Sequence, residues 1–129
     1  MSVDVGTSLA RAIQEQLDLK QRIFADVLPR LRADAILTSN SSSFPISAIA
    51  GGLPTANRFF GLHYFMPAHL VPLVEVVCGA VSDPALAEDL AQFMRATGKV
   101  PVIVRKDLPG FLANRLQHAL GREALALVD

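Results

Sequence analysis

The chain has 129 residues, of which 51% are hydrophobic, and this is enough for one domain with a single core. Its 12 basic and 12 acidic residues cancel, so the overall charge does not favour a nucleic acid or an anionic membrane as a partner. The single cysteine, Cys78, excludes an internal disulfide and a cysteine-cluster metal site. With no apolar run of the roughly 18 to 20 residues that span a bilayer and no signal-peptide pattern, we expect a soluble, cytoplasmic protein without a metal.

The first half of the chain predicts a long helix, a strand and a polar loop. Apolar residues recur at steps of three or four over residues 9–31, which is typical of an amphipathic helix, either continuous or broken near Asp18. A short apolar run at residues 35–38 predicts a strand, and the polar residues 39–43 predict a loop after it. Residues 46–50 predict a helical turn that stops at two glycines.

Two strands are predicted next, at residues 58–65 and 73–77, because both segments are rich in aromatic and branched residues. The segment between them contains Pro67 and Pro72 and is too short for the crossover helix of a parallel connection. We therefore expect the two strands to pair antiparallel.

The last third predicts a helix, a strand and a second helix. Ser82 or Asp83 can cap a helix with Pro84 in its first turn and Gly98 after its end. Residues 100–104 predict a buried strand and residues 107–110 a turn. This alternation of helices and strands predicts an α/β layered fold.

The final helix, expected over residues 111–128, carries an unusually broad apolar stripe. Its members are Phe111, Leu112, Leu116, Leu120 and Leu127. A small α/β layer is not expected to cover the whole stripe, so part of it should stay exposed. Because the helix ends without a cap or a polar tail, we expect more protein to follow it.

One histidine and one glutamate are candidates for chemistry. His63 lies at the predicted end of a strand, where ligands collect in open α/β sheets, although a lone histidine there is more often structural. Antiparallel pairing brings Glu75 within reach of it. A carboxylate inside the apolar segment 73–77 is costly to bury unpaired, so Glu75 needs a partner, which can be Arg58 or His63.

Four motifs, read in order, resemble the 3-hydroxyacyl-CoA dehydrogenase family. They are S-N-S-S-S at residues 39–43, G-L-H-Y-F at 61–65, L-V-E-V at 73–76 and P-G-F-L-A-N-R-L at 109–116. Residues 12–20 are also similar to the family's segment beside the cofactor. The resemblance implies NAD-dependent oxidation of an L-3-hydroxyacyl-CoA to a 3-ketoacyl-CoA in fatty acid metabolism. It also implies a small-molecule substrate and a homo-oligomer, such as a dimer.

The resemblance assigns roles to individual residues. Histidine is the side chain that ordinarily exchanges a proton near neutral pH, and His63 matches the family's general base, with Glu75 fixing its tautomer. Ser42 and Asn114 match residues that hold the reacting oxygen. The candidates for cofactor contacts are Glu15, Lys20, Asn40 and Ser42. Without the resemblance, the serine run is a turn, Asn114 a helix-start residue, and Glu15 and Lys20 part of a solvated helix face.

Two features depart from the family pattern. The family begins with a G-x-G-x-x-G turn that holds the cofactor pyrophosphate, and no such motif occurs in this sequence. Met66 stands where the family usually has an asparagine, three residues after the histidine. We therefore expect the chain alone to bind NAD weakly or not at all, and a truncated, non-catalytic chain, comparable to the lambda-crystallin relatives, stays an alternative.

The sequence around Leu73, Asn114 and Gln117 also resembles the relatives that oxidise gulonate or carnitine rather than acyl-CoA, so a non-CoA 3-hydroxy acid is a further alternative. The expected organisation is the second half of a Rossmann-type NAD-binding domain, with an antiparallel strand pair, over residues 1–106. Residues 107–129 are expected to begin an all-helical C-terminal domain with the linking helix.

Overall fold

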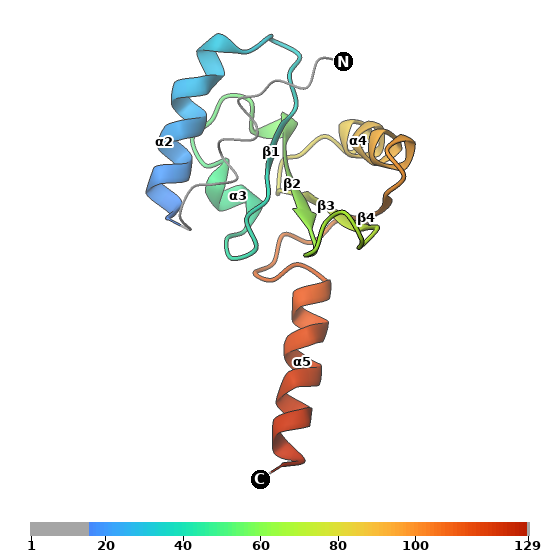
Figure 1. Ribbon diagram of the computed structural model, residues 1–129. Coiled ribbons are helices and arrows are strands. Elements are labelled where there is room, and N and C mark those ends of the chain that lie inside the picture. Colours follow the sequence, from blue (N-terminus) through green and yellow to red (C-terminus); the bar gives the residue numbers. More distant parts are fainter. Residues whose placement is uncertain (1–15, 129) are drawn as a thin grey trace.

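A four-stranded sheet with helices on both faces forms the body of the protein, and one long helix projects from it (Figure 1). The computed structural model describes residues 16–128. In chain order the elements are α2 (Leu17–Val27), the 3₁₀ turn η2 (Leu28–Arg30), β1 (Leu37–Ser39), α3 (Ile46–Ile49), the 3₁₀ turn η3 (Ala56–Arg58), β2 (Phe59–Tyr64), β3 (Leu73–Cys78), α4 (Pro84–Ala96), β4 (Val100–Val104) and α5 (Ala113–Ala126).

The strand order of the sheet is β1-β2-β3-β4. β1 pairs parallel with β2, β2 antiparallel with β3, and β3 parallel with β4. The predicted antiparallel pair and the α/β fold class are therefore confirmed. The strand direction reverses once, between β2 and β3. The carboxyl ends of β1 and β2 therefore lie at the same edge of the sheet as the beginnings of β3 and β4. This edge brings together the loop after β1, the end of β2 and the start of β3.

Each face of the sheet has its own apolar core, because side chains alternate along every strand. On one face, α2 and α3 contribute to the buried cluster Phe24, Leu37, Ile46, Ile49, Ala50, Phe59, Val77, Val104 and Phe111. On the other face, α4 contributes to the cluster Phe60, Val76, Ala87, Leu90 and Ala91. Figure 1 shows α2 and α3 on one side of the strands and α4 on the other.

Local sequence signals account for the limits of α4. The Asp83 carboxylate accepts a hydrogen bond from the backbone N–H of Ala85 at 2.9 Å, and Pro84 is the first helical residue. The helix is followed by Gly98 with a φ of 80°, in the left-handed region that glycine adopts without strain. The predicted helix limits are confirmed.

Gly61 lets α3 approach the sheet closely. A Cβ atom at this position would lie 2.9 Å from the side chains of both Ile46 and Val77. Any larger residue would therefore push α3 away from β2 and β3. The face that carries His63 depends on this close packing.

The first predicted helix is described only from residue 16, and its earlier part lies outside the described residues. Within the described part, Gln16 has an extended backbone (φ −123°, ψ 117°) and α2 begins at Leu17, so a helix that is continuous over residues 9–31 is wrong and the alternative of a break near Asp18 is confirmed. α2 changes to a 3₁₀ turn at Leu28–Arg30, where Pro29 has no N–H to continue the helical hydrogen bonds.

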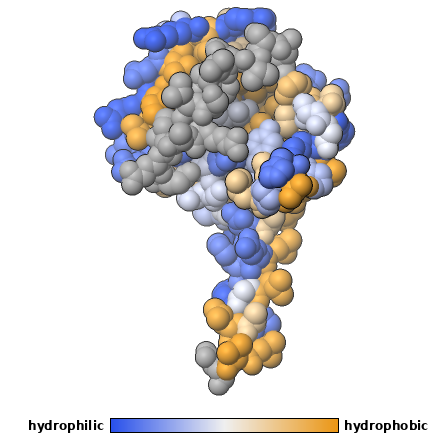
Figure 2. All heavy atoms as spheres, viewed as in Figure 1, coloured by the Kyte–Doolittle hydropathy of each residue, from blue (hydrophilic) through white to orange (hydrophobic). Residues whose placement is uncertain are grey.

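α5 buries none of its side chains and points away from the sheet (Figure 1). Leu116 and Leu120 are 66% and 73% exposed. Figure 2 shows apolar side chains along the projecting helix, so the expected exposure of the stripe is confirmed. Phe111 is the exception, since it is buried in the core of the body. Within residues 16–128 no helix combines the length and the apolar character needed to cross a bilayer.

Candidate active site

His63 and Glu75 are directly opposite each other on β2 and β3. The Nδ1 atom of His63 lies 2.8 Å from Oε2 of Glu75, and the two residues are only 4% and 1% exposed. The predicted juxtaposition is confirmed. Of the two partners considered for Glu75, the structure selects His63 and not Arg58, which lies at the far end of β2.

The second oxygen of Glu75 receives two backbone hydrogen bonds from the start of α5. Oε1 lies 3.1 Å from the N–H nitrogen of Leu112 and 2.9 Å from that of Ala113. Burial by itself raises the pKa of Glu75, but the hydrogen bonds from His63, Ala113 and Leu112 outweigh it and hold the pKa below its ordinary value. The positive end of the helix also favours a negative charge here. Glu75 is therefore an ionised, fully hydrogen-bonded carboxylate at neutral pH.

Ser42 completes a chain of three polar side chains. Its Oγ atom lies 2.8 Å from Nε2 of His63, on the opposite side of the ring from Glu75. An ionised carboxylate can only accept a hydrogen bond, so the neutral imidazole carries its proton on Nδ1 and donates it to Glu75. The lone pair of Nε2 then accepts a hydrogen bond from the Ser42 hydroxyl. The arrangement presents a proton-accepting nitrogen at the edge of the sheet.

Asn40 fastens the serine-rich loop to the sheet. Its side-chain oxygen accepts a hydrogen bond from the backbone N–H of Tyr64 at 2.9 Å. Tyr64 is the last residue of β2 and directly follows His63, so this bond sets the distance between the loop and the histidine. The side-chain NH₂ group of Asn40 has no hydrogen-bond partner among the described residues.

Two aromatic rings pack against the imidazole. The ring centroid of Phe65 lies 4.8 Å from that of His63, and the centroid of Phe111 lies 5.5 Å from it, both with edge-to-face geometry. These contacts oppose rotation of the imidazole and exclude water from its buried side. Sequence reasoning did not find them, because residue 111 is brought next to residue 63 only by the path of the turn before α5.

Lys99 holds the loop that connects the two site strands. Its Nζ atom donates to the backbone oxygens of Ala68 and of Val71, the latter at 3.1 Å. The loop therefore has a fixed path although Met66 and Leu70 at its surface are largely exposed. No motif or periodicity in the sequence indicated this role.

Asp107 fixes the other end of the serine-rich segment. Its two carboxylate oxygens accept hydrogen bonds from the backbone N–H groups of Ile46 and Ser47, each at 2.7 Å. These donors begin α3, so Asp107 caps that short helix from the turn after β4. Asp107 is thus a structural residue that ties the turn before α5 to the segment that carries Ser42.

The remaining predicted site residues are not joined to this chain of hydrogen bonds. Asn114 is the second residue of α5, and its side chain has no hydrogen bond within the described part of the protein. Lys20 lies in α2, is only 5% exposed and makes a contact of its own, so the alternative of a solvated surface lysine is wrong. Glu15 lies outside the described residues.

The described residues fit one end of NAD. Ser42 and His63 lie at the carboxyl ends of two parallel strands, where nucleotide cofactors are bound in open α/β sheets. Polar groups at this edge suit the nicotinamide end of the cofactor and a hydroxyl group beside it. For the pyrophosphate, no G-x-G-x-x-G sequence occurs anywhere in the chain.

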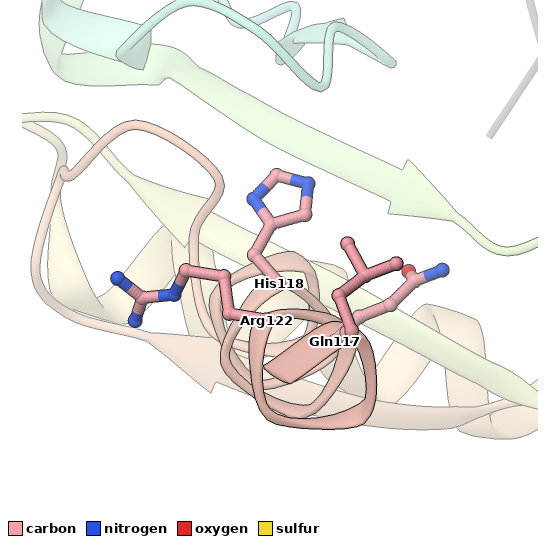
Figure 3. A pocket seen from close by; sticks show the side chains of 5 residues that line it. Gln117, His118 and Arg122 are labelled. Atoms are coloured by element: carbon pink, nitrogen blue, oxygen red, sulfur yellow. The ribbon is translucent and has the colours of Figure 1, made fainter. Parts of the chain in front are cut away.

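Neither of two surface hollows is lined by Ser42, His63 or Glu75. One of about 670 Å³ is lined by Gln117, His118, Gly121, Arg122 and Leu125, which all belong to α5. Figure 3 shows the labelled side chains of this hollow extending from that single helix, so the hollow is open helix surface. A second hollow of about 390 Å³ lies beside the end of β4 and borders the site, because its lining includes Phe111 and Leu112, which contact His63 and Glu75. Residues 16–128 contain no group of three or more side chains that could hold a metal ion.

The fold and the match to known proteins define the class as an NAD-binding dehydrogenase domain. The family model described as "3-hydroxyacyl-CoA dehydrogenase, NAD binding domain" matches residues 7–108. The chain belongs to the 3-hydroxyacyl-CoA dehydrogenase family. The resemblance read from the four motifs is confirmed.

Individual relatives differ in what they are named for. The chain is 30% identical over 132 residues to 5-formyl-3-hydroxy-2-methylpyridine 4-carboxylate 5-dehydrogenase of Mesorhizobium japonicum, covering 98% of this chain and 43% of the relative. It is 38% identical over 114 residues to L-carnitine dehydrogenase of Streptomyces griseus, covering 88% of this chain and 34% of the relative.

Among solved structures, the 3-hydroxybutyryl-CoA dehydrogenase of Escherichia coli K12 is 33% identical with a TM-score of 0.85, over 98% of this chain and 28% of that chain. The chain thus spans less than half the length of each of these three relatives.

Proposed function

We propose that this chain is part of an enzyme that oxidises the 3-hydroxyl group of an L-3-hydroxyacyl-CoA, with His63 as the general base. The observation that carries the proposal is the continuous hydrogen-bonded chain Ser42–His63–Glu75, in which both contacts measure 2.8 Å. Three groups of this kind form the usual arrangement for moving a proton to or from a hydroxyl.

The proton of the substrate hydroxyl passes to Nε2 of His63. The charge that develops on the ring is stabilised by the ionised Glu75 at Nδ1, which also prevents the ring from turning. General base catalysis of this kind typically accelerates a reaction by about 10² to 10⁴. Ser42, beside Nε2, donates a hydrogen bond to the substrate oxygen as it becomes a carbonyl, and Asn114 supports the same oxygen. When bound, NAD supplies the hydride acceptor.

On the cofactor side, Ser42 and Asn40 are the residues that we assign to the nicotinamide end. Asn40 keeps its NH₂ group as a donor, because only its side-chain oxygen is used by Tyr64. Lys20 and Glu15 are assigned weaker contacts with the cofactor on the strength of the family resemblance alone.

A second candidate function is the oxidation of a 3-hydroxy acid that carries no CoA. Two observations favour it. The names of two relatives, the L-carnitine dehydrogenase and the pyridine carboxylate dehydrogenase, refer to substrates without CoA. Met66, three residues after the histidine, is also an exposed apolar side chain where the family pattern has an amide. A chain without catalytic activity is the third alternative.

Rates of NADH formation by the assembled enzyme, of which this chain is proposed to be a part, separate these alternatives. The substrates are L-3-hydroxybutyryl-CoA and L-carnitine, and the variants are His63→Gln and the control His118→Gln, whose side chain is exposed on α5. The proposal predicts turnover of the CoA ester and a loss of about 10² to 10⁴ in kcat for His63→Gln alone. Turnover of carnitine alone favours the second candidate, and equal rates for His63→Gln and the unaltered chain exclude His63 as the base.

We also propose the domain organisation expected from the sequence, with part of a Rossmann-type domain over residues 1–106 and the beginning of a helical domain over 107–129. Its support is that α5 buries no side chain and exposes an apolar stripe. Such a stripe is typical of a helix that packs against further protein. This proposed organisation implies two partners, a small-molecule substrate and a second copy of the chain.

A further inference from the structure

The beginning of α5 is attached to the sheet through the active-site carboxylate. The N–H groups of Leu112 and Ala113 donate to Oε1 of Glu75, and these are the hydrogen bonds that the described structure shows between this first turn and the sheet. No side chain within α5 is buried. The position of this helix and the position of the Glu75 carboxylate are therefore directly connected.

The turn before α5 has an uncommon backbone. Gly110 and Phe111 are consecutive and both left-handed, with φ values of 77° and 49°. A phenylalanine in this region is unusual and persists only where the surroundings enforce it. Here the Phe111 ring is buried, and its centroid lies 5.5 Å from that of His63. One turn thus contacts both members of the His63–Glu75 pair.

We propose that the Gly110–Phe111 turn and the first N–H groups of α5 form a positioning element for the His63–Glu75 pair. The two N–H groups hold Oε1 of Glu75, which leaves Oε2 directed at Nδ1 of His63, while the Phe111 ring packs against the imidazole. Neither Gly110 nor Phe111 touches the reacting atoms. The importance of this positioning element for catalysis rests on the proposed function. The coupling between the turn and Glu75 does not depend on that function.

Removal of these contacts has a defined physical consequence. Without the two N–H groups, the carboxylate can rotate about its own axis and loses donors that stabilise its charge in a buried site. The pKa of Glu75 then rises, because burial is no longer outweighed to the same extent. The other titratable group that acts on Glu75 is His63, from β2, and its contact with Oε2 is the one that the rotation disturbs.

The unaltered chain provides the first test. The carboxyl carbon of Glu75 and the amide protons of Leu112 and Ala113 are followed by NMR as the pH is lowered. The expected result is one shared midpoint below the ordinary pKa of a glutamate, about 4.3. Amide resonances that do not respond while Glu75 titrates would overturn the proposal, because the helix would then not sense the carboxylate.

Substitution at the turn provides the second test. Gly110→Ala places a Cβ in a left-handed backbone and 3.4 Å from the Arg115 side chain. Gly98→Ala is the matched control, because Gly98 has a φ of 80° with nothing near a Cβ and lies at the end of α4. Gly110→Asn is the conservative variant, since asparagine tolerates this region. We expect Gly110→Ala to raise the pKa of Glu75 and the other two variants to leave it unchanged.

In the assembled enzyme, Gly110→Ala is expected to lower kcat by about ten- to a hundredfold with a smaller change in KM. An unchanged Glu75 titration in Gly110→Ala would refute the positioning element. If Gly110→Ala does not fold, the shared titration of Glu75 and the Leu112 and Ala113 amides in the unaltered chain decides the question. A normal Glu75 response combined with full activity of His63→Gln would count against the proposed function alone.

Discussion

The His63 imidazole and the Glu75 carboxylate form a buried pair across an antiparallel strand pair, with Nδ1 and Oε2 at 2.8 Å. Both side chains are almost completely removed from water, and each satisfies the other. A buried carboxylate without its partner is among the most unfavourable features of a protein core. The pair is therefore important for the stability of the fold as well as for the proposed chemistry.

Replacement of Glu75 tests the structural part of this statement. We expect Glu75→Ala to lower the free energy of unfolding by about 3 to 5 kcal/mol, and Glu75→Gln by about 1 to 3 kcal/mol, since the amide oxygen still accepts the N–H groups of α5. Urea denaturation measures both. The control is Glu88→Ala, which removes an exposed ion pair with Arg95 and should change stability by no more than about 1 kcal/mol. Equal decreases in the free energy of unfolding for Glu75→Ala and Glu88→Ala would contradict the account.

The pKa of Glu75 also predicts a dependence of stability on pH. The folded chain holds this pKa below its ordinary value, so the folded state binds the proton less tightly than the unfolded state does. The stabilisation by Glu75 is therefore complete above about pH 5 and is lost as the pH falls through the lower, folded-state pKa. The difference in unfolding free energy between the unaltered chain and Glu75→Gln should shrink below about pH 4. A difference that stays constant down to about pH 3 would be evidence against an ionised Glu75.

Local signals in the sequence predicted most of the elements. The apolar run at 100–104 coincides with β4, but the expected burial of this strand is wrong, because β4 lies at the edge of the sheet and only Val104 is buried. Asp83 and Gly98 mark the two ends of α4 as expected. The His63–Glu75 pairing was predictable because the short connection between the two strands allows only one direction of pairing.

Other parts of the site could not be predicted, for two physical reasons. The N–H groups of Leu112 and Ala113 reach Glu75 through two left-handed residues, and no side-chain pattern reports a backbone path. Without the family resemblance, the charge of Lys20 favours a solvated helix face, yet Lys20 is buried, because the long apolar stem of a lysine can pack against other residues. Residue type indicates where a group prefers to lie, whereas the tertiary structure decides which partner it meets.

Cofactor affinity is expected to be low for the chain of 129 residues by itself. The polar groups around Ser42 can contact only one end of NAD, and the sequence has no glycine turn to receive the pyrophosphate. Isothermal titration calorimetry should show binding weaker than micromolar or no heat at all. A 1:1 complex with micromolar affinity would mean that a phosphate site has been overlooked.

Self-association through α5 is the next prediction. Leu116 and Leu120 are one helical turn apart and largely exposed, so the chain should associate as its concentration rises. The double substitution Leu116→Asp and Leu120→Asp should abolish association and leave the body folded, because neither side chain is buried. The control is His118→Asp, which introduces the same side chain on the opposite side of the helix. Sedimentation velocity distinguishes the outcomes, and an unaltered chain that stays monomeric at high concentration would refute the prediction.

The central claim is that Glu75 fixes the tautomer of His63, so that Nε2 is free to take a proton. ¹⁵N–¹H correlation spectra of the His63 ring test it most directly, at about pH 8, where a histidine is ordinarily neutral. The account predicts a proton on Nδ1 and a lone pair on Nε2, with loss of this preference in Glu75→Gln. A proton found on Nε2 in the unaltered chain would contradict it, since that nitrogen could not then act as the base.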